Sequence, residues 1–174
     1  MTPTQVQAEA LQQVSAGWAA AKAAAAAAKP PANTVDVGVG NASTLLAYFP
    51  ATLNVKAGTT VNFVNRAPRE VHNLVFGPKK YIEQLQKQTD LFPTGPKSPN
   101  QVAPFLPYGS EPKGQYTYTG TNHGNGFFAT PLTVGPSPVP LPKAWRVTFN
   151  TPGTYKYFCW IHGPDMAGTI VVTK

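Results

Sequence analysis

The sequence has few of the residues from which cross-links and most metal centres are built. Its 174 residues include one cysteine and three histidines. A single cysteine excludes an internal disulfide, and it also excludes zinc or iron–sulfur sites that need several thiolates. A c-type haem is excluded as well, because no Cys-x-x-Cys-His run is present. Any cysteine chemistry of this chain therefore depends on Cys159.

Charged residues and long apolar runs are scarce too. Only 12% of the residues are charged, and no apolar run reaches the roughly 18 residues that a membrane-spanning helix needs. The 14 Lys and Arg outnumber the 7 Asp and Glu, for a net charge of +7, but they are scattered along the chain. This spread does not predict a nucleic-acid-binding surface. It predicts a basic surface that favours anionic partners.

Proline and glycine are abundant instead, at 19 and 15 residues. With 42% hydrophobic residues, this composition predicts one loop-rich, β-rich globular domain. Residues 1–33 differ, because they are rich in alanine and predict a helix that ends at Lys29-Pro30-Pro31. The larger apolar side chains of this helix share roughly one face, and we expect that face to dock on the domain. They are Val6, Leu11, Val14 and Trp18.

The Ala-rich segment is interpreted as a helical spacer between an anchor and the domain. It lacks the basic start and the strongly apolar core of a secretory signal, so we expect Met1 to open an already trimmed chain. No signal or anchor is therefore expected within this sequence.

Short alternating segments in the remainder of the chain predict strands. They are residues 35–39, 52–56, 60–65, 70–76, 144–149, 154–158 and 168–173. Antiparallel strands with turn punctuation predict a sandwich or a barrel. The predicted domain spans residues 34–174, with residues 77–121 as an irregular insertion of functional or lid-like type. A short helix at 81–88 and a strand at 115–119 are expected around this insertion.

Cys159, His162 and Met166 fall within eight positions, between two strand-like segments. A Gly-Pro pair keeps the segment irregular, so the three side chains are able to converge. A thiolate, an imidazole and a thioether suit a soft, redox-active metal, copper above all. His72 is the natural fourth member. Two imidazoles and a thiolate form a near-trigonal plane that a long thioether contact completes, which is a blue-copper arrangement.

Other interpretations of these residues stay open at this point. A lone Cys159 is most often a small buried hydrophobe. The alternative role of His72 is a satisfied core histidine, but the separate soft-ligand segment favours metal ligation. A nucleophilic Cys–His pair requires an orienting Asn or Asp and an oxyanion hole, and it leaves Met166 unexplained. His123 lies in a Gly/Asn-rich stretch that predicts a surface turn. Neither His123 nor Asp165, a hard carboxylate, is favoured as a copper ligand.

Two ordered stretches make the chain resemble the cupredoxins, in particular the plastocyanin and azurin group of small type 1 copper proteins. They are residues 55–65 followed by His72 and Asn73, and residues 149–159 followed by His162, Met166 and residues 168–172. The resemblance implies a Greek-key β-sandwich that binds one type 1 copper ion. In it, His72, Cys159 and His162 would bind copper strongly and Met166 weakly.

The chain departs from the family at the residue after the cysteine. Family members often have Ser or Thr there, hydrogen-bonded to the Asn that follows the first histidine ligand, whereas this chain has Trp160. The corresponding residue here, Asn73, is a candidate to link the two ligand segments through hydrogen bonds, and its alternative role is an ordinary polar residue of a strand. Trp160 lacks the hydroxyl that usually completes this link. The ligand segment is also short, with two residues between Cys159 and His162 and three between His162 and Met166.

By resemblance, the function is one-electron transfer between redox partner proteins, with copper cycling between Cu(I) and Cu(II). The electron would leave through the exposed edge of His162, framed by Trp160, Ile161 and Pro164. The family usually works outside the cytoplasm, in the periplasm or on the outer face of the cell membrane, where the N-terminal region could act as a tether. We expect a monomer that binds no nucleic acid, is not an enzyme and works with acidic redox partners.

The rival functions differ in their ligands. Copper oxidase and nitrite reductase domains bind further copper through histidines that flank the cysteine, whereas Phe158 and Trp160 flank Cys159. A binuclear purple-copper site needs two cysteines. The closest alternative is an extracytoplasmic copper carrier or storage protein, because the same ligands also hold Cu(I). A copper-free sandwich used for adhesion is the third possibility.

Overall fold

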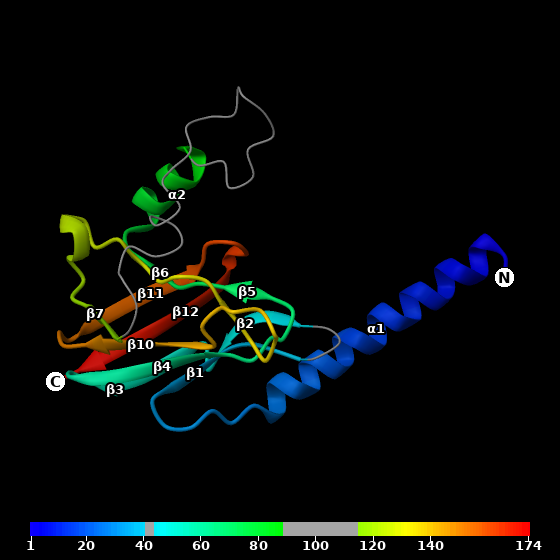
Figure 1. Cartoon of the computed structure of the whole chain (residues 1–174), viewed down its shortest axis with the longest axis horizontal. Coiled ribbons are helices and arrows are strands. Elements are labelled where there is room, and N and C mark those ends of the chain that lie inside the picture. The colour runs from blue at the N-terminus through cyan, green and yellow to red at the C-terminus, as the bar shows by residue number, and fades with distance from the viewer. Residues whose placement is uncertain (41–43, 89–114) are drawn as a thin grey trace.

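A computed structural model of the chain describes residues 1–40, 44–88 and 115–174, and of residues 86–88 only the backbone. Figure 1 shows a β-rich body from which one long helix projects. Residues 89–114 of the predicted insertion lie outside the described residues. The division into residues 1–33 and 34–174 stays a prediction.

Two five-stranded sheets make up the body. The first has the order β2 (Leu45–Phe49), β1 (Thr34–Val39), β4 (Thr59–Asn65), β10 (Ala144–Phe149) and β7 (Gln115–Tyr118). The second has the order β3 (Thr52–Lys56), β12 (Gly163–Thr173), β11 (Gly153–Cys159), β6 (Val75–Phe76) and β8 (Phe128–Ala129). A two-stranded sheet pairs β5 (Val71–His72) with β9 (Thr133–Val134). The predicted all-β fold with an N-terminal helix is therefore confirmed.

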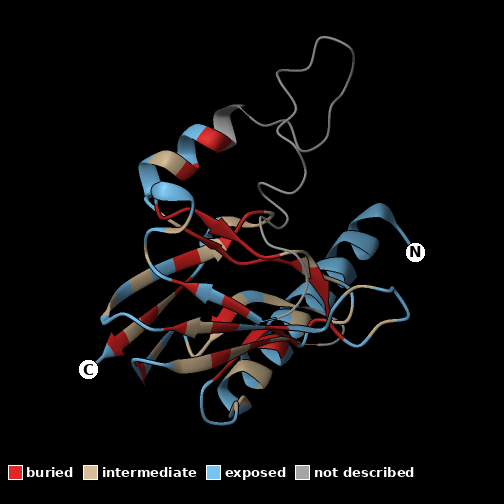
Figure 2. Cartoon of the chain, turned by 60° about the vertical axis from the view of Figure 1, so that its left-hand side comes forward, coloured by how far each residue is buried: buried red, intermediate tan, exposed pale blue. Residues whose placement is uncertain are grey.

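The core lies between the two large sheets. Along β10, Trp145, Val147 and Phe149 are buried while Arg146 is exposed, as expected for a strand with one face on a core. One buried cluster joins side chains of both sheets, so the sheets form a sandwich (Figure 2). Its members include Val61, Phe63, Val147, Phe149, Tyr157, Ile170 and Val172. Cys159 and Met166 belong to the same cluster, so both sulfur-bearing side chains are part of the core of the sandwich.

Helix α1 (Pro3–Ala27) begins with a capping box. The Thr2 hydroxyl accepts a hydrogen bond from the Gln5 amide, and the Gln5 side chain accepts one from the Thr2 amide. The expected docking of its larger apolar side chains is wrong, because Leu11, Val14 and Trp18 are more than half exposed.

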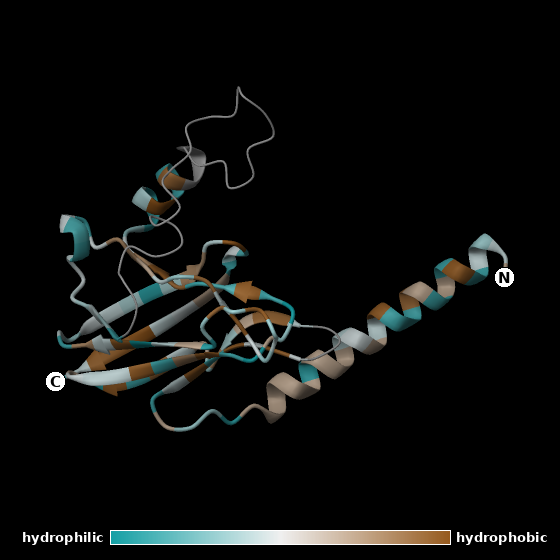
Figure 3. Cartoon of the chain, viewed as in Figure 1, coloured by the Kyte–Doolittle hydropathy of each residue, from teal (hydrophilic) through white to brown (hydrophobic). Residues whose placement is uncertain are grey.

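The residue of α1 that is buried against the sandwich has a small side chain instead. The buried residue of the helix is Ala21, and α1 meets β1 and β2. Figure 3 shows apolar segments along the half of α1 that extends away from the sheets. Small side chains near the C-terminal end allow close approach, whereas the bulkier ones lie beyond the edge of the body. No helix within the described ranges is long and apolar enough to cross a membrane.

The single strand predicted at residues 70–76 is two strands in different sheets. β5 pairs with β9, whereas β6 pairs with β11 and β8. Between them, the Leu74 amide donates to the Thr130 hydroxyl, and the Thr130 amide donates to the Leu74 carbonyl, both at 2.9 Å. These bonds replace a continuous ladder, and they let the chain pass from one sheet to the other just after His72.

The helix predicted at residues 81–88 is confirmed as α2 (Lys79–Gln88). Ile82 and Leu85 of this helix pack in a second buried cluster with Val75, Phe127 and Trp160. His123, the histidine that is not a predicted copper ligand, lies on the 3-10 turn η1 (Asn122–Gly124) and is exposed. The prediction of a surface turn there is confirmed.

Two buried tyrosines in ring contact allow a matched test of this packing. The Tyr48 and Tyr157 ring centroids are 4.7 Å apart, and the Tyr48 hydroxyl donates to the Asn73 carbonyl at 3.0 Å. The buried Tyr157 hydroxyl has no hydrogen-bond partner among the described residues. We expect Tyr48→Phe to lower the free energy of unfolding by about 1–2 kcal/mol, and Tyr157→Phe to leave it unchanged or raise it by up to about 1 kcal/mol. Urea unfolding of the metal-free variants measures both, and equal losses would contradict the assigned bonding.

Candidate metal centre

Three strand ends bring the predicted donor side chains together. His72 is the last residue of β5, Cys159 is the last residue of β11, and His162 lies in the turn that leads into β12. The β11–β12 register shifts at this point, because Phe158 faces Ala167 while Cys159 faces Gly163. The shift leaves residues 164–166 as a bulge on β12. The predicted loop is thus shorter than residues 159–166, since β12 begins at Gly163.

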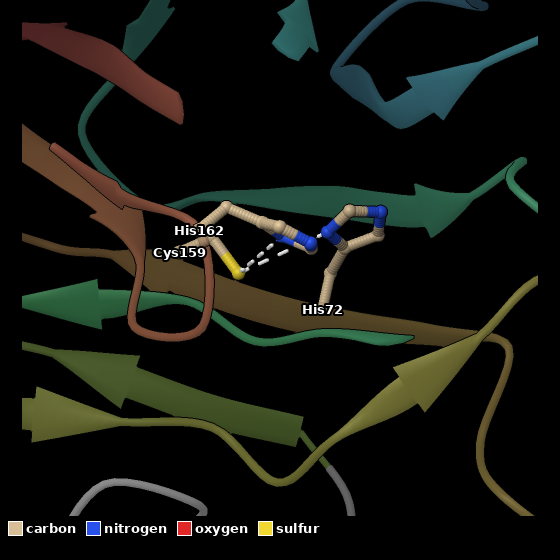
Figure 4. Close-up of side chains that lie close together, drawn as sticks. All are labelled: His72, Cys159 and His162. Carbon is tan, nitrogen blue, oxygen red and sulfur yellow. Dashed lines mark hydrogen bonds between the residues drawn. The ribbon is translucent and has the colours of Figure 1, made fainter. Parts of the chain in front are cut away.

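The donor atoms of His72, Cys159 and His162 all lie within 4.8 Å of one another (Figure 4). Cys159 Sγ is 3.8 Å from His72 Nδ1 and 3.4 Å from His162 Nδ1. A trigonal ion with bonds of about 2.0 Å to nitrogen and about 2.3 Å to sulfur requires S···N separations of about 3.7 Å. The two observed separations lie on either side of that value. Both sulfur–nitrogen separations therefore suit a single metal ion bound by the three side chains.

Met166 and Asp165 point to different environments, although they are neighbours on the bulge. Met166 is 1% exposed and lies in the core cluster that contains Cys159, whereas Asp165 is exposed. The thioether is thus on the buried side of the bulge and the carboxylate is in solvent. Ligation by Met166 stays a prediction.

His72 is held as a neutral imidazole. Burial, with a further contribution from nearby His162, lowers the pKa of His72 to about 3. The neutral ring is the form that binds metals. Its Nδ1 faces Cys159, and its Nε2 is buried with no hydrogen-bond partner among the described residues.

Cys159 is fully buried, and its surroundings act on the thiol in two directions. Burial raises the pKa of the Cys159 thiol, while hydrogen bonds from the backbone amides of Asn73, His162 and Ile161 lower it. Burial has the larger effect, so the metal-free side chain is a thiol. The three amides nevertheless point at the sulfur and suit the negative charge of a metal-bound thiolate.

Asn73 links the two ligand segments. Its Oδ1 accepts a hydrogen bond from the Trp160 amide at 3.0 Å and lies 3.7 Å from Cys159 Sγ. The predicted link is confirmed, and it uses the main chain, so it does not need the Ser or Thr that the family often has at position 160. The Trp160 side chain packs against α2 and is only 4% exposed. The expectation that Trp160 frames the exposed edge of His162 is therefore wrong.

His162 forms the solvent-facing side of the group. Its side chain is 15% exposed, and its Nε2 lies 3.7 Å from Glu70 Oε2. Burial lowers the pKa of His162, and Glu70 acts in the opposite direction. Sequence reasoning did not find Glu70; the signal available was its position two residues before His72. The exposed His123 turn lies outside this group of three.

Gly38 of β1 makes room for the His72 ring. A Cβ at position 38 would lie 3.1 Å from His72 Nε2 and 3.0 Å from Ala67 Cβ, and φ there is +66°. Gly58 also has a positive φ, +86°, but a Cβ there would meet nothing within 4 Å. Alanine at either position therefore adopts a disfavoured backbone conformation that costs about 1–2 kcal/mol.

We expect both Gly38→Ala and Gly58→Ala to lower the free energy of unfolding, but only Gly38→Ala to weaken metal binding. Displacement of the His72 ring should reduce the affinity for Cu(I) by about tenfold or more. Competition titrations with a Cu(I) chelator measure the difference. Equal affinities in the two variants would show that Gly38 does not shape the site.

Comparisons with known proteins give matches among solved structures. No protein-family model and no curated protein sequence matches this chain. Among solved structures, amicyanin from Paracoccus versutus is similar at 22% identity, with a TM-score of 0.45 over 86% of this chain and 89% of that one. A reduced tryptophan-to-tyrosine mutant of amicyanin matches at 23% identity, with a TM-score of 0.45 over 86% and 90% of the two chains.

A methionine-to-alanine mutant of amicyanin in the Cu(I) form matches at 22% identity, with a TM-score of 0.44 over 86% and 90% of the two chains. The link to a family comes from features of this molecule itself rather than from these matches. These features are the sandwich of two five-stranded sheets and the convergence of His72, Cys159 and His162. The sandwich and this group of side chains agree with what the sequence resemblance to the cupredoxins implies.

Proposed function

We propose that this chain transfers single electrons by means of one type 1 copper ion held by His72, Cys159 and His162, with Met166 as a weaker fourth ligand. The convergence of one sulfur and two imidazole nitrogens within 4.8 Å carries the proposal. Two imidazoles, a thiolate and a distant thioether are the donor set of blue-copper electron-transfer sites. Zinc and hard cations are less well served by a thioether.

When bound, copper supplies the one-electron chemistry between Cu(I) and Cu(II). The chain's own contribution is a ligand set that need not rearrange. His72 and Cys159 are fully buried, and Asn73 ties their two segments together. Three backbone amides hold the sulfur, so the same positions serve both oxidation states.

The exposed edge of His162 is the proposed path for the electron. His72, Cys159 and Met166 are each at most 1% exposed, whereas the His162 side chain is 15% exposed. A partner that docks over this edge is separated from the proposed metal position only by the imidazole ring of His162. The net charge of +7 favours redox partners with acidic surfaces.

We propose an electron carrier rather than an enzyme, because only three histidines are present and His123 lies on an exposed turn. The ligands of a second, catalytic copper are therefore lacking in the sequence. We also propose a monomer outside the cytoplasm, in the periplasm or at the outer membrane face, in keeping with the family that the chain resembles. Residues 1–33 would then act as a spacer that holds the domain of residues 34–174 near a membrane.

The alternative is an extracytoplasmic copper carrier or storage protein. The same donors hold Cu(I), so the ligand set alone fits both functions. The burial of His72 and Cys159 favours electron transfer, because release of copper would require the tied ligand segments to separate.

Addition of Cu(II) to the metal-free protein tests the proposal. We expect one copper per chain, an intense visible thiolate-to-Cu(II) absorption band, and reversible bleaching by a one-electron reductant with copper retained. Cys159→Ser should lose the band, and His123→Gln, which changes the exposed histidine, should keep it. A colourless copper-loaded protein that loses Cu(I) readily would favour the carrier. Adhesive activity that survives unchanged in Cys159→Ser would favour the third possibility, a copper-free adhesion protein.

A further inference from the structure

The carboxylate of Glu70 lies against the outer nitrogen of His162. Glu70 Oε2 is 3.7 Å from His162 Nε2, while Nδ1 of the same ring is 3.4 Å from Cys159 Sγ. The ring therefore lies between the proposed metal position and a negative charge. The distance to Glu70 is that of an ion pair rather than of a short hydrogen bond, so its effect is mainly electrostatic.

The main chain at Glu70 is held by the turn between β4 and β5. Asn65, which is 1% exposed at the end of β4, donates from Nδ2 to the Glu70 carbonyl and to the Thr133 carbonyl, both at 3.2 Å. Its Oδ1 accepts a hydrogen bond from the Ala67 amide at 2.9 Å. One buried side chain thus holds both ends of the turn. The same turn delivers Glu70 to His162 and His72 to Cys159.

The two imidazoles of the group consequently differ at their outer nitrogens. His72 Nε2 is buried with no hydrogen-bond partner among the described residues, whereas His162 Nε2 faces a carboxylate. Histidines that bind metals commonly direct their other N–H to a carboxylate, which fixes the tautomer and makes the ring a more basic ligand. A negative charge near a metal also stabilises the more positive of two oxidation states.

We infer that Glu70 is a positioning residue that orients His162 with its proton on Nε2 and favours Cu(II) over Cu(I). This inference rests on the proposed copper function and adds to it a determinant of the reduction potential. The Glu70 carboxylate acts through His162. The N–H group on Nε2 points at the negative charge, so Nδ1 carries no proton and its lone pair faces the proposed metal position beside Cys159. Partial exposure of the Glu70 side chain, at 41%, weakens the effect by solvent screening.

Two substitutions separate charge from positioning. Glu70→Gln removes the charge and keeps an acceptor of the same shape, and Glu70→Ala removes both. Asp165→Asn is the matched control, because Asp165 is an exposed carboxylate three residues after His162. The side chains of Glu70 and Asp165 are both solvent-accessible, so all three variants should fold, and their free energies of unfolding are measured alongside.

The first readout is the reduction potential of the copper-loaded full chain. We expect Glu70→Gln to lower the ratio of the Cu(II) to the Cu(I) binding constant by about tenfold, which corresponds to a potential about 59 mV higher. Asp165→Asn should shift the potential much less. Equal shifts in the two variants, or an unchanged potential in Glu70→Gln, would overturn the inference.

The second readout needs no metal. Proton–nitrogen correlation spectra of the metal-free protein, at mildly alkaline pH, report which nitrogen of His162 carries the proton. We expect Nε2 in the wild type and in Glu70→Gln, and a mixture of tautomers in Glu70→Ala. An unchanged tautomer in Glu70→Ala would overturn the positioning role. A wild type that shows no thiolate-to-Cu(II) band would overturn the proposed function and this inference together, whereas the other negative results concern Glu70 alone.

Discussion

The hydrogen bond from the Trp160 amide to the Asn73 side chain is the interaction on which the rest of the centre depends. It joins the segment that carries His72 to the segment that carries Cys159, across 87 positions of sequence. The Tyr48 hydroxyl supports the same residue from the core, through the Asn73 carbonyl. Because the bond is made to a main-chain amide, position 160 is free to carry a tryptophan, whose ring anchors α2. One contact therefore couples the ligand geometry to both the sandwich and the inserted helix.

Burial gives the centre an inner and an outer side. On the inner side, the neutral His72 ring and the Cys159 sulfur are withdrawn from water, and burial opposes charge on both in the metal-free protein. A bound cation would reverse that preference at the sulfur, toward which three amides already point. On the outer side, His162 remains partly exposed beside Glu70. Buried His72 and Cys159 with a partly exposed His162 ring suit the proposed one-electron transfer to a docked partner.

Sequence reasoning found most of the strands and the three side chains that converge, although it missed β2, β8 and β9. The spacing of Cys159, His162 and Met166 is visible within one turn, and alternation marks most strands. It missed features that depend on tertiary contacts. The apolar–polar alternation over residues 70–76 does not distinguish one strand in one sheet from two strands in two sheets. Likewise, the apolar face of α1 does not indicate whether another part of the protein covers it. Glu70 was missed because the turn that Asn65 fixes has no sequence period.

X-ray absorption at the copper edge of the loaded, oxidised protein tests the central claim most directly, because it counts the ligands themselves. We predict one copper ion per chain with one short sulfur ligand and two imidazole nitrogens, and loss of the sulfur contribution in Cys159→Ser. A copper environment made only of nitrogen and oxygen in the unaltered chain would contradict it.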